Sequence, residues 1–188
     1  MFLGIVGLNG SGKDTVAQYL VQKHNFVHED FGQEIRDELK TLGKNYLDRI
    51  EMINLANERR AKFGHNYWAI RLLTKHPEGK NLVLTSIRNP AEIDEIKSRG
   101  GIVVEVFADI KTRYARTVDR VKNDSTAHGD VVSFEDFKRK EEMELSSTDP
   151  AKQQLLKCIA AAQYKLNNEG SQKQLEAQLE ELFRKLKG

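Results

Sequence analysis

The stretch that decides the fold is FLGIVGLNGSGKDT, Phe2–Thr15, because it sets an apolar run directly before a glycine-rich turn. Phe2–Val6 reads as a buried strand, and the letters after it match the G-x-x-x-x-G-K frame of a phosphate-binding loop. Glycines at positions 7, 10 and 12 allow backbone angles that other residues resist. The N–H groups of such a turn converge on an anion, and the next helix adds its positive N-terminal end.

This loop predicts a site for ATP with Mg²⁺, since Lys13 supplies a mobile positive charge for the outer phosphates. The motif usually has Ser or Thr directly after the lysine, but here Asp14 follows and Thr15 comes one place later. The hydroxyl that normally binds Mg²⁺ is therefore displaced or replaced by a carboxylate. The predicted nucleotide-binding residues are Gly7, Asn9, Gly10, Ser11, Gly12, Lys13, Asp14 and Thr15.

The composition is that of an ordinary globular protein. Its 188 residues suit one domain over 1–188, and 39% hydrophobic residues can form a core. The net charge of +2 argues against nucleic acid as a partner, and no apolar run nears the ~18 residues of a membrane span. Cys158 is the only cysteine, and the N-terminus enters the first strand at once, so we expect a cytoplasmic protein without a signal peptide. No pattern indicates an oligomeric state.

The rest of the chain alternates strands with helices. The predicted strands are Phe2–Val6, Phe26–Asp30, Asn81–Thr85, Ile102–Ala108 and Gln163–Leu166. The predicted helices are Thr15–His24, Phe31–Leu42, Tyr46–Phe63, Tyr67–Lys75, Ala91–Arg99, Ile110–Lys122, Phe134–Leu145, Ala151–Ala161 and Gln172–Lys187. This alternation predicts an α/β fold of three layers around a five-stranded parallel sheet. A helical insert (residues 31–76) and a lid region (residues 113–149) would flank the carboxyl edge of the strands, where such sheets bind ligands.

Over most of its length the chain resembles the nucleoside monophosphate kinases and their relatives. GLNGSGKDTVAQYL (7–20) looks like the loop of adenylate kinases and of phage-type deoxynucleoside monophosphate kinases. NERRAKFG (57–64) and KCIAAAQYKLNNEG (157–170) are similar to archaeal nucleotide-kinase or dephospho-CoA-kinase-like proteins. The resemblance implies a P-loop kinase fold and ATP-dependent phosphoryl transfer to a small-molecule nucleotide acceptor.

The resemblance also implies roles for arginines. FGQEIRDEL (31–39) and LVLTSIRNPAEIDEI (82–96) are similar to the segments that hold the acceptor phosphate, so Arg36 and Arg88 fall on the binding arginines. Two guanidinium forks suit bidentate binding of one phosphate. RYARTVDR (113–120) is similar to an arginine-bearing lid, and its arginines share one helix face by spacing. Arg116 and Arg120 are the predicted lid pair for the γ phosphate.

Two positions leave the metal and the acceptor open. Relatives often carry an Asp near the end of the third strand, where this chain has Thr85, so the predicted Mg²⁺ ligands are Asp14, then Asp30, then Asp109. Asp30 could also cap the following helix, or act as a general base if the acceptor is a hydroxyl. The predicted catalytic residues are Lys13, Arg88, Arg116, Arg120 and Asp30. The first choice is a nucleoside monophosphate kinase, deoxynucleotides included; the alternatives are a dephospho-CoA-type hydroxyl kinase and a nucleotide-binding switch or slow ATPase.

Overall fold

The computed structural model describes residues 1–76, 79–123, 133–145 and 148–187. The strands are β1 (Phe2–Val6), β2 (Val27–Asp30), β3 (Leu82–Thr85), β4 (Ile102–Phe107) and β5 (Tyr164–Asn167). They form one all-parallel sheet in the order β2-β3-β1-β4-β5. The predicted α/β class and five-stranded parallel sheet are therefore confirmed.

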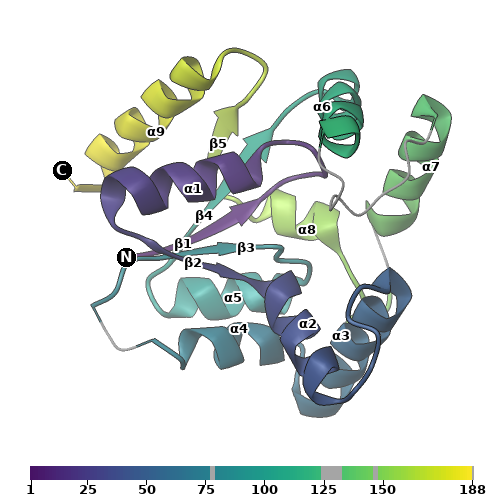
Figure 1. Cartoon of the computed structure of the whole chain (residues 1–188). Helices are drawn as coiled ribbons and strands as arrows, with labels where there is room; N and C mark the ends of the chain where they lie inside the picture. The colour runs from purple at the N-terminus through teal and green to yellow at the C-terminus, as the bar shows by residue number, and fades with distance from the viewer. Residues whose placement is uncertain (77–78, 124–132, 146–147, 188) are drawn as a thin grey trace.

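The helices cover both faces of this sheet. They are α1 (Lys13–His24), α2 (Phe31–Thr41), α3 (Arg49–Phe63), α4 (Tyr67–Leu73), α5 (Pro90–Ser98), α6 (Ile110–Asn123), α7 (Phe134–Leu145), α8 (Leu155–Ala160) and α9 (Gln172–Lys187). Figure 1 shows α1 and α9 on one face and α4 and α5 on the other. The helices of the predicted insert, α2 and α3, lie beyond one end of the sheet, and α6 and α7 lie beyond the same end (Figure 1).

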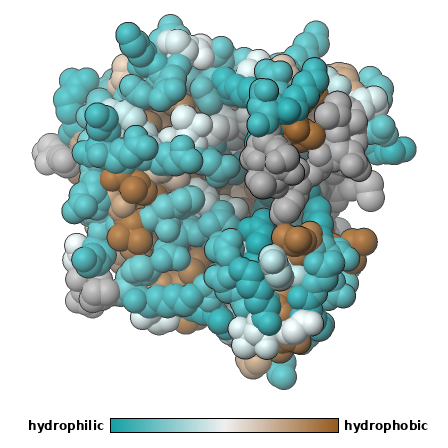
Figure 2. Space-filling view, viewed as in Figure 1, coloured by the Kyte–Doolittle hydropathy of each residue, from teal (hydrophilic) through white to brown (hydrophobic). Residues whose placement is uncertain are grey.

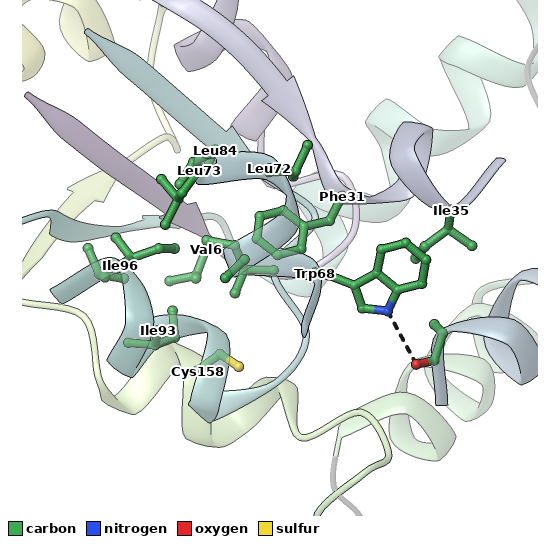
Figure 3. Packing of buried hydrophobic residues seen from close by; sticks show 14 of the residues in the cluster. Val6, Phe31, Ile35, Trp68, Leu72, Leu73, Leu84, Ile93, Ile96 and Cys158 are labelled. Carbon is green, nitrogen blue, oxygen red and sulfur yellow. Dashed lines mark hydrogen bonds between the residues drawn. The ribbon is translucent and has the colours of Figure 1, made fainter. Parts of the chain in front are cut away.

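Side chains that alternate along the strands divide the core in two. On β1, Leu3 and Ile5 pack with α1 and α9, whereas Val6 packs in the cluster that includes α4 and α5. Trp68 of α4 is fully buried in this second cluster, and its indole Nε1–H donates to Ala56 O at 3.2 Å (Figure 3). That bond joins α4 to α3, so the apolar core extends under the predicted insert.

Two helices begin three or four residues later than the sequence predicted. We predicted one helix from Tyr46, but α3 begins at Arg49 because Asp48 Oδ1 accepts hydrogen bonds from the N–H groups of Ile50 and Glu51. The last helix before β5, predicted from Ala151, begins at Leu155. Of the predicted lid region, residues 124–132 and 146–147 lie outside the described residues.

The outer surface agrees with the composition. The face in Figure 2 is mostly hydrophilic, with small separate hydrophobic areas. Among the described residues, no helix has the length and apolar character that a membrane crossing requires.

Candidate active site

The phosphate loop has the backbone shape that its glycines predict. Gly7, Gly10 and Gly12 have φ values of 148°, 77° and 98°, all in the region that side chains disfavour. Each glycine is also crowded: a Cβ on Gly10 would collide with Arg113 O, and one on Gly12 with the side chain of Asn168. The loop needs glycine at these positions both for its angles and for its close neighbours.

Two side chains of the loop are prepared for an anion. Ser11 is 1% exposed, and its Oγ has no hydrogen-bond partner among the described residues. Lys13 Nζ donates to Leu8 O at 2.9 Å. Burial, together with the positive charges of Arg88 and Arg113, lowers the pKa of Lys13 to about 8. An unpartnered hydroxyl and a cation destabilised by other cations are the features that a bound phosphate would relieve.

Arg113 is the arginine of α6 that supports this loop. It is 3% exposed; Nη1 donates to Asn9 O at 3.2 Å and Nε donates to Ala108 O at 2.9 Å. The same guanidinium forms a bidentate pair with Glu141 of α7, with 2.9 Å between Nη2 and Oε1. One buried side chain thus joins the phosphate loop, the end of β4 and the described part of the predicted lid.

The two arginines of the predicted lid pair, Arg116 and Arg120, lie in different environments. Arg116 is half-buried, and its Nη2 donates to Asn168 O at 2.8 Å, while its Nη1 is buried without a partner among the described residues. Arg120, one turn further along α6, is exposed. Asn168 in turn donates from Nδ2 to Ser11 O at 2.8 Å. Arg116 therefore reaches the phosphate loop through Asn168, and the role of both arginines toward a γ phosphate stays a prediction.

Asp30 ends β2 opposite Thr85 of β3. Its Oδ2 accepts hydrogen bonds from Thr85 Oγ1 at 2.8 Å and Ser86 Oγ at 2.6 Å. Its Oδ1 accepts from Gln33 N at 2.7 Å, so Asp30 is also the predicted cap of α2. Although burial raises the pKa of Asp30, these three hydrogen bonds and the nearby His28 outweigh it and lower the pKa below its ordinary value.

His28 extends the hydrogen-bond network of Asp30 through Thr85. Its Nε2 lies 2.7 Å from Thr85 Oγ1, whose one proton is already donated to Asp30. His28 must therefore donate from Nε2 and accept at Nδ1 when neutral. His28 thus donates to Thr85, and Thr85 donates to Asp30, so this chain of hydrogen bonds ends at the carboxylate. The arrangement holds Asp30 as an anion.

Asp30 lines a polar cleft of about 600 Å³ at the carboxyl edge of the sheet. All residues that line it are polar or charged: Asp14, His28, Glu29, Asp30, Gln33, Glu34, Arg36, Asp37, Lys75 and Ser86. Arg36 Nη1 and Asp30 Oδ1 lie on the same side of Gly32, 3.5 Å and 2.8 Å from the point that a Cβ there would occupy. The cleft therefore brings together three predicted site residues: Asp14, Asp30 and Arg36.

The cleft contains carboxylate oxygens, which are the ligands that Mg²⁺ prefers. Among the described residues, no group of three or more His, Cys, Asp or Glu side chains is arranged to hold a metal ion. Asp14 is exposed in the first turn of α1, and Asp30 shares the cleft with it. Asp109 instead caps the start of α6 by accepting from Lys111 N at 2.9 Å. Asp14 and Asp30 thus fit a hydrated Mg²⁺ whose other ligands come from phosphate oxygens.

Several residues of the site were not singled out from the sequence. Asn168 lies in the segment 157–170 that carries part of the resemblance, but nothing there distinguished it from its neighbours, and no motif marks Glu141 of α7. Glu92 could have been found, because N-x-x-E at a helix start is a capping-box signature. The predicted loop residues Asn9, Asp14 and Thr15 are present where expected, with Thr15 exposed beside Asp14.

Comparison with known proteins finds relatives in sequence and neighbours in fold. Two relatives are UPF0200 protein Ta0179 of Thermoplasma acidophilum, 28% identical, and UPF0200 protein TV0279 of Thermoplasma volcanium, 30% identical; each alignment covers 144 residues and 76% of both chains. Among solved structures, shikimate kinase from Acinetobacter baumannii in complex with shikimate superimposes with a TM-score of 0.55. That likeness covers 98% of this chain and 92% of the other at 22% identity, so it shows the fold.

A parallel sheet, a phosphate loop after β1 and cations gathered around it define a protein with the P-loop kinase-like fold. Within that class, the chain belongs to the family described as AAA domain, whose sequence model matches residues 3–145.

Proposed function

We propose that this protein transfers the γ phosphate of ATP to a nucleoside monophosphate, deoxynucleotides included, with Mg²⁺ as cofactor. The observation that carries the proposal is the convergence of cations at the phosphate loop. Arg88 and Arg113 lie near enough to Lys13 to lower its pKa, although they come from segments 75 and 100 residues away. Positive groups gathered around the phosphate loop suit the charge that spreads over a phosphoryl group during transfer.

The residues divide the work by position. The loop amides, Ser11 and Lys13 would hold the donor phosphates, and Arg88 would bind the acceptor phosphate beside them. Arg36 lies in the adjoining cleft and would bind the same acceptor phosphate from the other side. Mg²⁺ bound with ATP would neutralise charge between the phosphates, with Asp14 and Asp30 holding its water ligands.

Asp30 is the residue that favours a phosphate acceptor over a hydroxyl. A general base works best with a pKa near the operating pH, whereas four donors, directly or through Thr85, keep the pKa of Asp30 low. An acceptor phosphate is already anionic near pH 7 and needs no base. Asp30 as a permanent anion suits metal and arginine positioning.

A hydroxyl acceptor is the second candidate, because Asp30 lines the cleft in which an acceptor would lie. One protein of similar fold is a shikimate kinase with shikimate bound, which makes a non-nucleotide acceptor worth testing. The resemblance to dephospho-CoA-kinase-like proteins points the same way.

The deciding experiment is an ADP-release assay over nucleoside and deoxynucleoside monophosphates, nucleosides, shikimate and dephospho-CoA, run on the wild type and on Asp30→Asn. We expect turnover with a monophosphate, and a loss in Asp30→Asn of no more than about tenfold, because no proton has to be removed. Thr85→Val is the matched control, since it removes one hydrogen bond to Asp30 and keeps the carboxylate. A loss beyond about a thousandfold in Asp30→Asn, with ATP and Mg²⁺ binding intact, would favour the hydroxyl acceptor.

A further inference from the structure

The four residues 86–89, between β3 and α5, form a loop on which several parts of the site depend. Ser86 has a φ of 61°, unusual for a residue with a side chain, and from there its Oγ reaches Asp30. Two residues later, Arg88 approaches Lys13 closely enough to lower the pKa of the ammonium group. The position of this short loop therefore sets the position of Arg88 relative to both Asp30 and Lys13.

The buried carboxylate of Glu92 binds the backbone of this loop. Glu92 is 0% exposed, and its Oε2 accepts hydrogen bonds from Arg88 N at 3.1 Å and Asn89 N at 3.0 Å. Its Oε1 accepts two more from Arg60, at 2.9 Å from Nε and 2.8 Å from Nη2. Arg60 is 2% exposed and belongs to α3, in the predicted insert. A capping box would need only Glu92 and Asn89, so the added arginine calls for a reason of its own.

The loop is also held from the other side. Arg88 O accepts from Gln154 N at 2.9 Å, and Asn89 Nδ2 donates to Pro150 O at 2.7 Å and to Lys152 O at 3.2 Å. Residues 150–154 lead from the predicted lid region into α8. The backbone of Arg88 is thus fixed between the predicted insert and the chain that returns from the lid region.

We propose that Arg60 and Glu92 are positioning residues for Arg88, and that they couple helix α3 to the point of phosphoryl transfer. The proposal rests on the function proposed above, in which Arg88 binds the acceptor phosphate. One oxygen of Glu92 holds the Arg88 amide and the other holds α3, so neither partner moves alone without breaking a buried, charge-assisted hydrogen bond. Small displacements of a positioning group cost a large part of the rate, which makes such a tether useful.

The test compares Arg60→Met with Arg59→Met. Arg59 is the preceding residue on α3 and is also ion-paired, but its partners, Glu38 of α2 and Glu58 of α3, both lie within the predicted insert. We expect Arg60→Met to raise the acceptor KM and lower kcat, with kcat/KM down about tenfold or more by displacement of Arg88 and with ATP affinity unchanged within about twofold. Arg59→Met should leave acceptor kcat/KM within about twofold of the wild type, and Arg60→Lys should recover part of the loss by keeping a charge beside Glu92.

A second readout does not depend on activity. Hydrogen exchange of the Arg88 and Asn89 amides should be at least about tenfold faster in Arg60→Met than in Arg59→Met, because their acceptor Glu92 has lost its partner. If Arg60→Met does not fold, Arg60→Lys is judged by the same two measurements, with smaller changes in the same direction expected. Exchange and kcat/KM that match those of Arg59→Met would overturn the proposal. If the wild type phosphorylates no acceptor, the proposed function fails, and the exchange rates alone decide whether Arg60 and Glu92 hold the loop.

Discussion

The two sides of the candidate site that we propose for the phosphate donor and the acceptor are built in different ways. The donor side is a short local turn, in which three glycines set the backbone and the helix α1 follows directly. The acceptor side is assembled from distant segments: Asp30 bonds to Thr85, 55 residues away, and Arg60 bonds to Glu92, 32 residues away. The comparison shows that a phosphate loop is encoded by a few consecutive residues, whereas an acceptor site depends on the packing of the whole fold.

The two sides also differ in charge. Lys13 and Arg113 lie at the proposed donor end with Arg88 beside them, whereas the adjoining cleft contains more carboxylates than cations. Several of these carboxylates are paired within the predicted insert, as Glu34 is with Arg71 at 2.5 Å and with Lys75. The donor end is therefore ready for an anion, and the cleft is stiffened by its own ion pairs before an acceptor enters.

The largest effect should come from the donor side. Lys13→Ala removes the mobile cation at the loop, and we expect kcat to fall by about 10²–10³ or more, the usual cost of losing one preorganised charge at a transition state. The melting temperature should not fall, because the ammonium that is lost was destabilised by burial and by neighbouring arginines. Steady-state kinetics and thermal melting check both expectations. Turnover above a tenth of the wild type would refute the role of Lys13.

On the acceptor side the expected effects are smaller and confined to one substrate. Arg88→Ala and Arg36→Ala should each raise the acceptor KM and lower kcat, by about 10- to 100-fold in kcat/KM for the loss of a charge-assisted bidentate contact. The KM for ATP should change little in Arg36→Ala, since Arg36 lies in the cleft and not at the loop. Lys40→Ala, an exposed change on the same helix, is the control. A variant that loses ATP binding but keeps a normal acceptor KM would contradict the division into two sides.

The contrast between the sides also explains what the sequence could predict. The order and type of the elements follow from apolar periodicity and from glycine and proline positions, so the sheet was predicted correctly and most helix bounds were correct to within two residues. Their exact starts depend on side-chain caps such as Asp48, which periodicity does not reveal.

The candidate site was predictable in the same uneven way. The loop residues 7–15 form a contiguous motif. Asp30 was a candidate from its place at the end of β2, and Arg36 was a candidate from the resemblance of residues 31–39 to an acceptor-binding segment. Arg113, by contrast, looked like one of three equivalent arginines on a helix face. Only the fold shows that it is buried against Asn9 and paired with Glu141. A partner chosen by tertiary packing, such as Asn168 for Ser11, leaves no mark in a single sequence.

The pKa of Lys13 gives a test of the donor side by pH. Lys13 must be protonated to bind phosphate, and its pKa of about 8 means that it loses its proton above pH 8 in the free protein. Affinity for ATP should therefore be flat below pH 8 and fall by up to about tenfold per pH unit above it, with proton uptake on binding. Lys13→Arg should bind with no such decline, because a guanidinium stays charged. Calorimetric titrations between pH 7 and 9.5 in two buffers measure both quantities, and equal proton uptake in the two proteins would argue against this origin.

The smallest expected effect concerns Asp14, which lies between the two sides: it follows Lys13 in the chain and lines the acceptor cleft. If Asp14 holds Mg²⁺ through water, Asp14→Ala should raise the Mg²⁺ concentration needed for half-maximal activity by a few-fold, about the worth of one exposed carboxylate. Asp14→Ser should restore part of the affinity by rebuilding the common motif, and Thr15→Ala should show whether the displaced hydroxyl shares the task.

Asp14→Ala should also lower the pKa of Lys13 further, because the Asp14 charge raises it, so the decline in ATP affinity should begin at lower pH. The pH shift without a change in Mg²⁺ dependence would assign Asp14 to the donor lysine and to the start of α1, where an acidic side chain is favoured by the helix dipole. Both changes together would place the metal at the boundary between donor and acceptor, where a phosphoryl group has to pass.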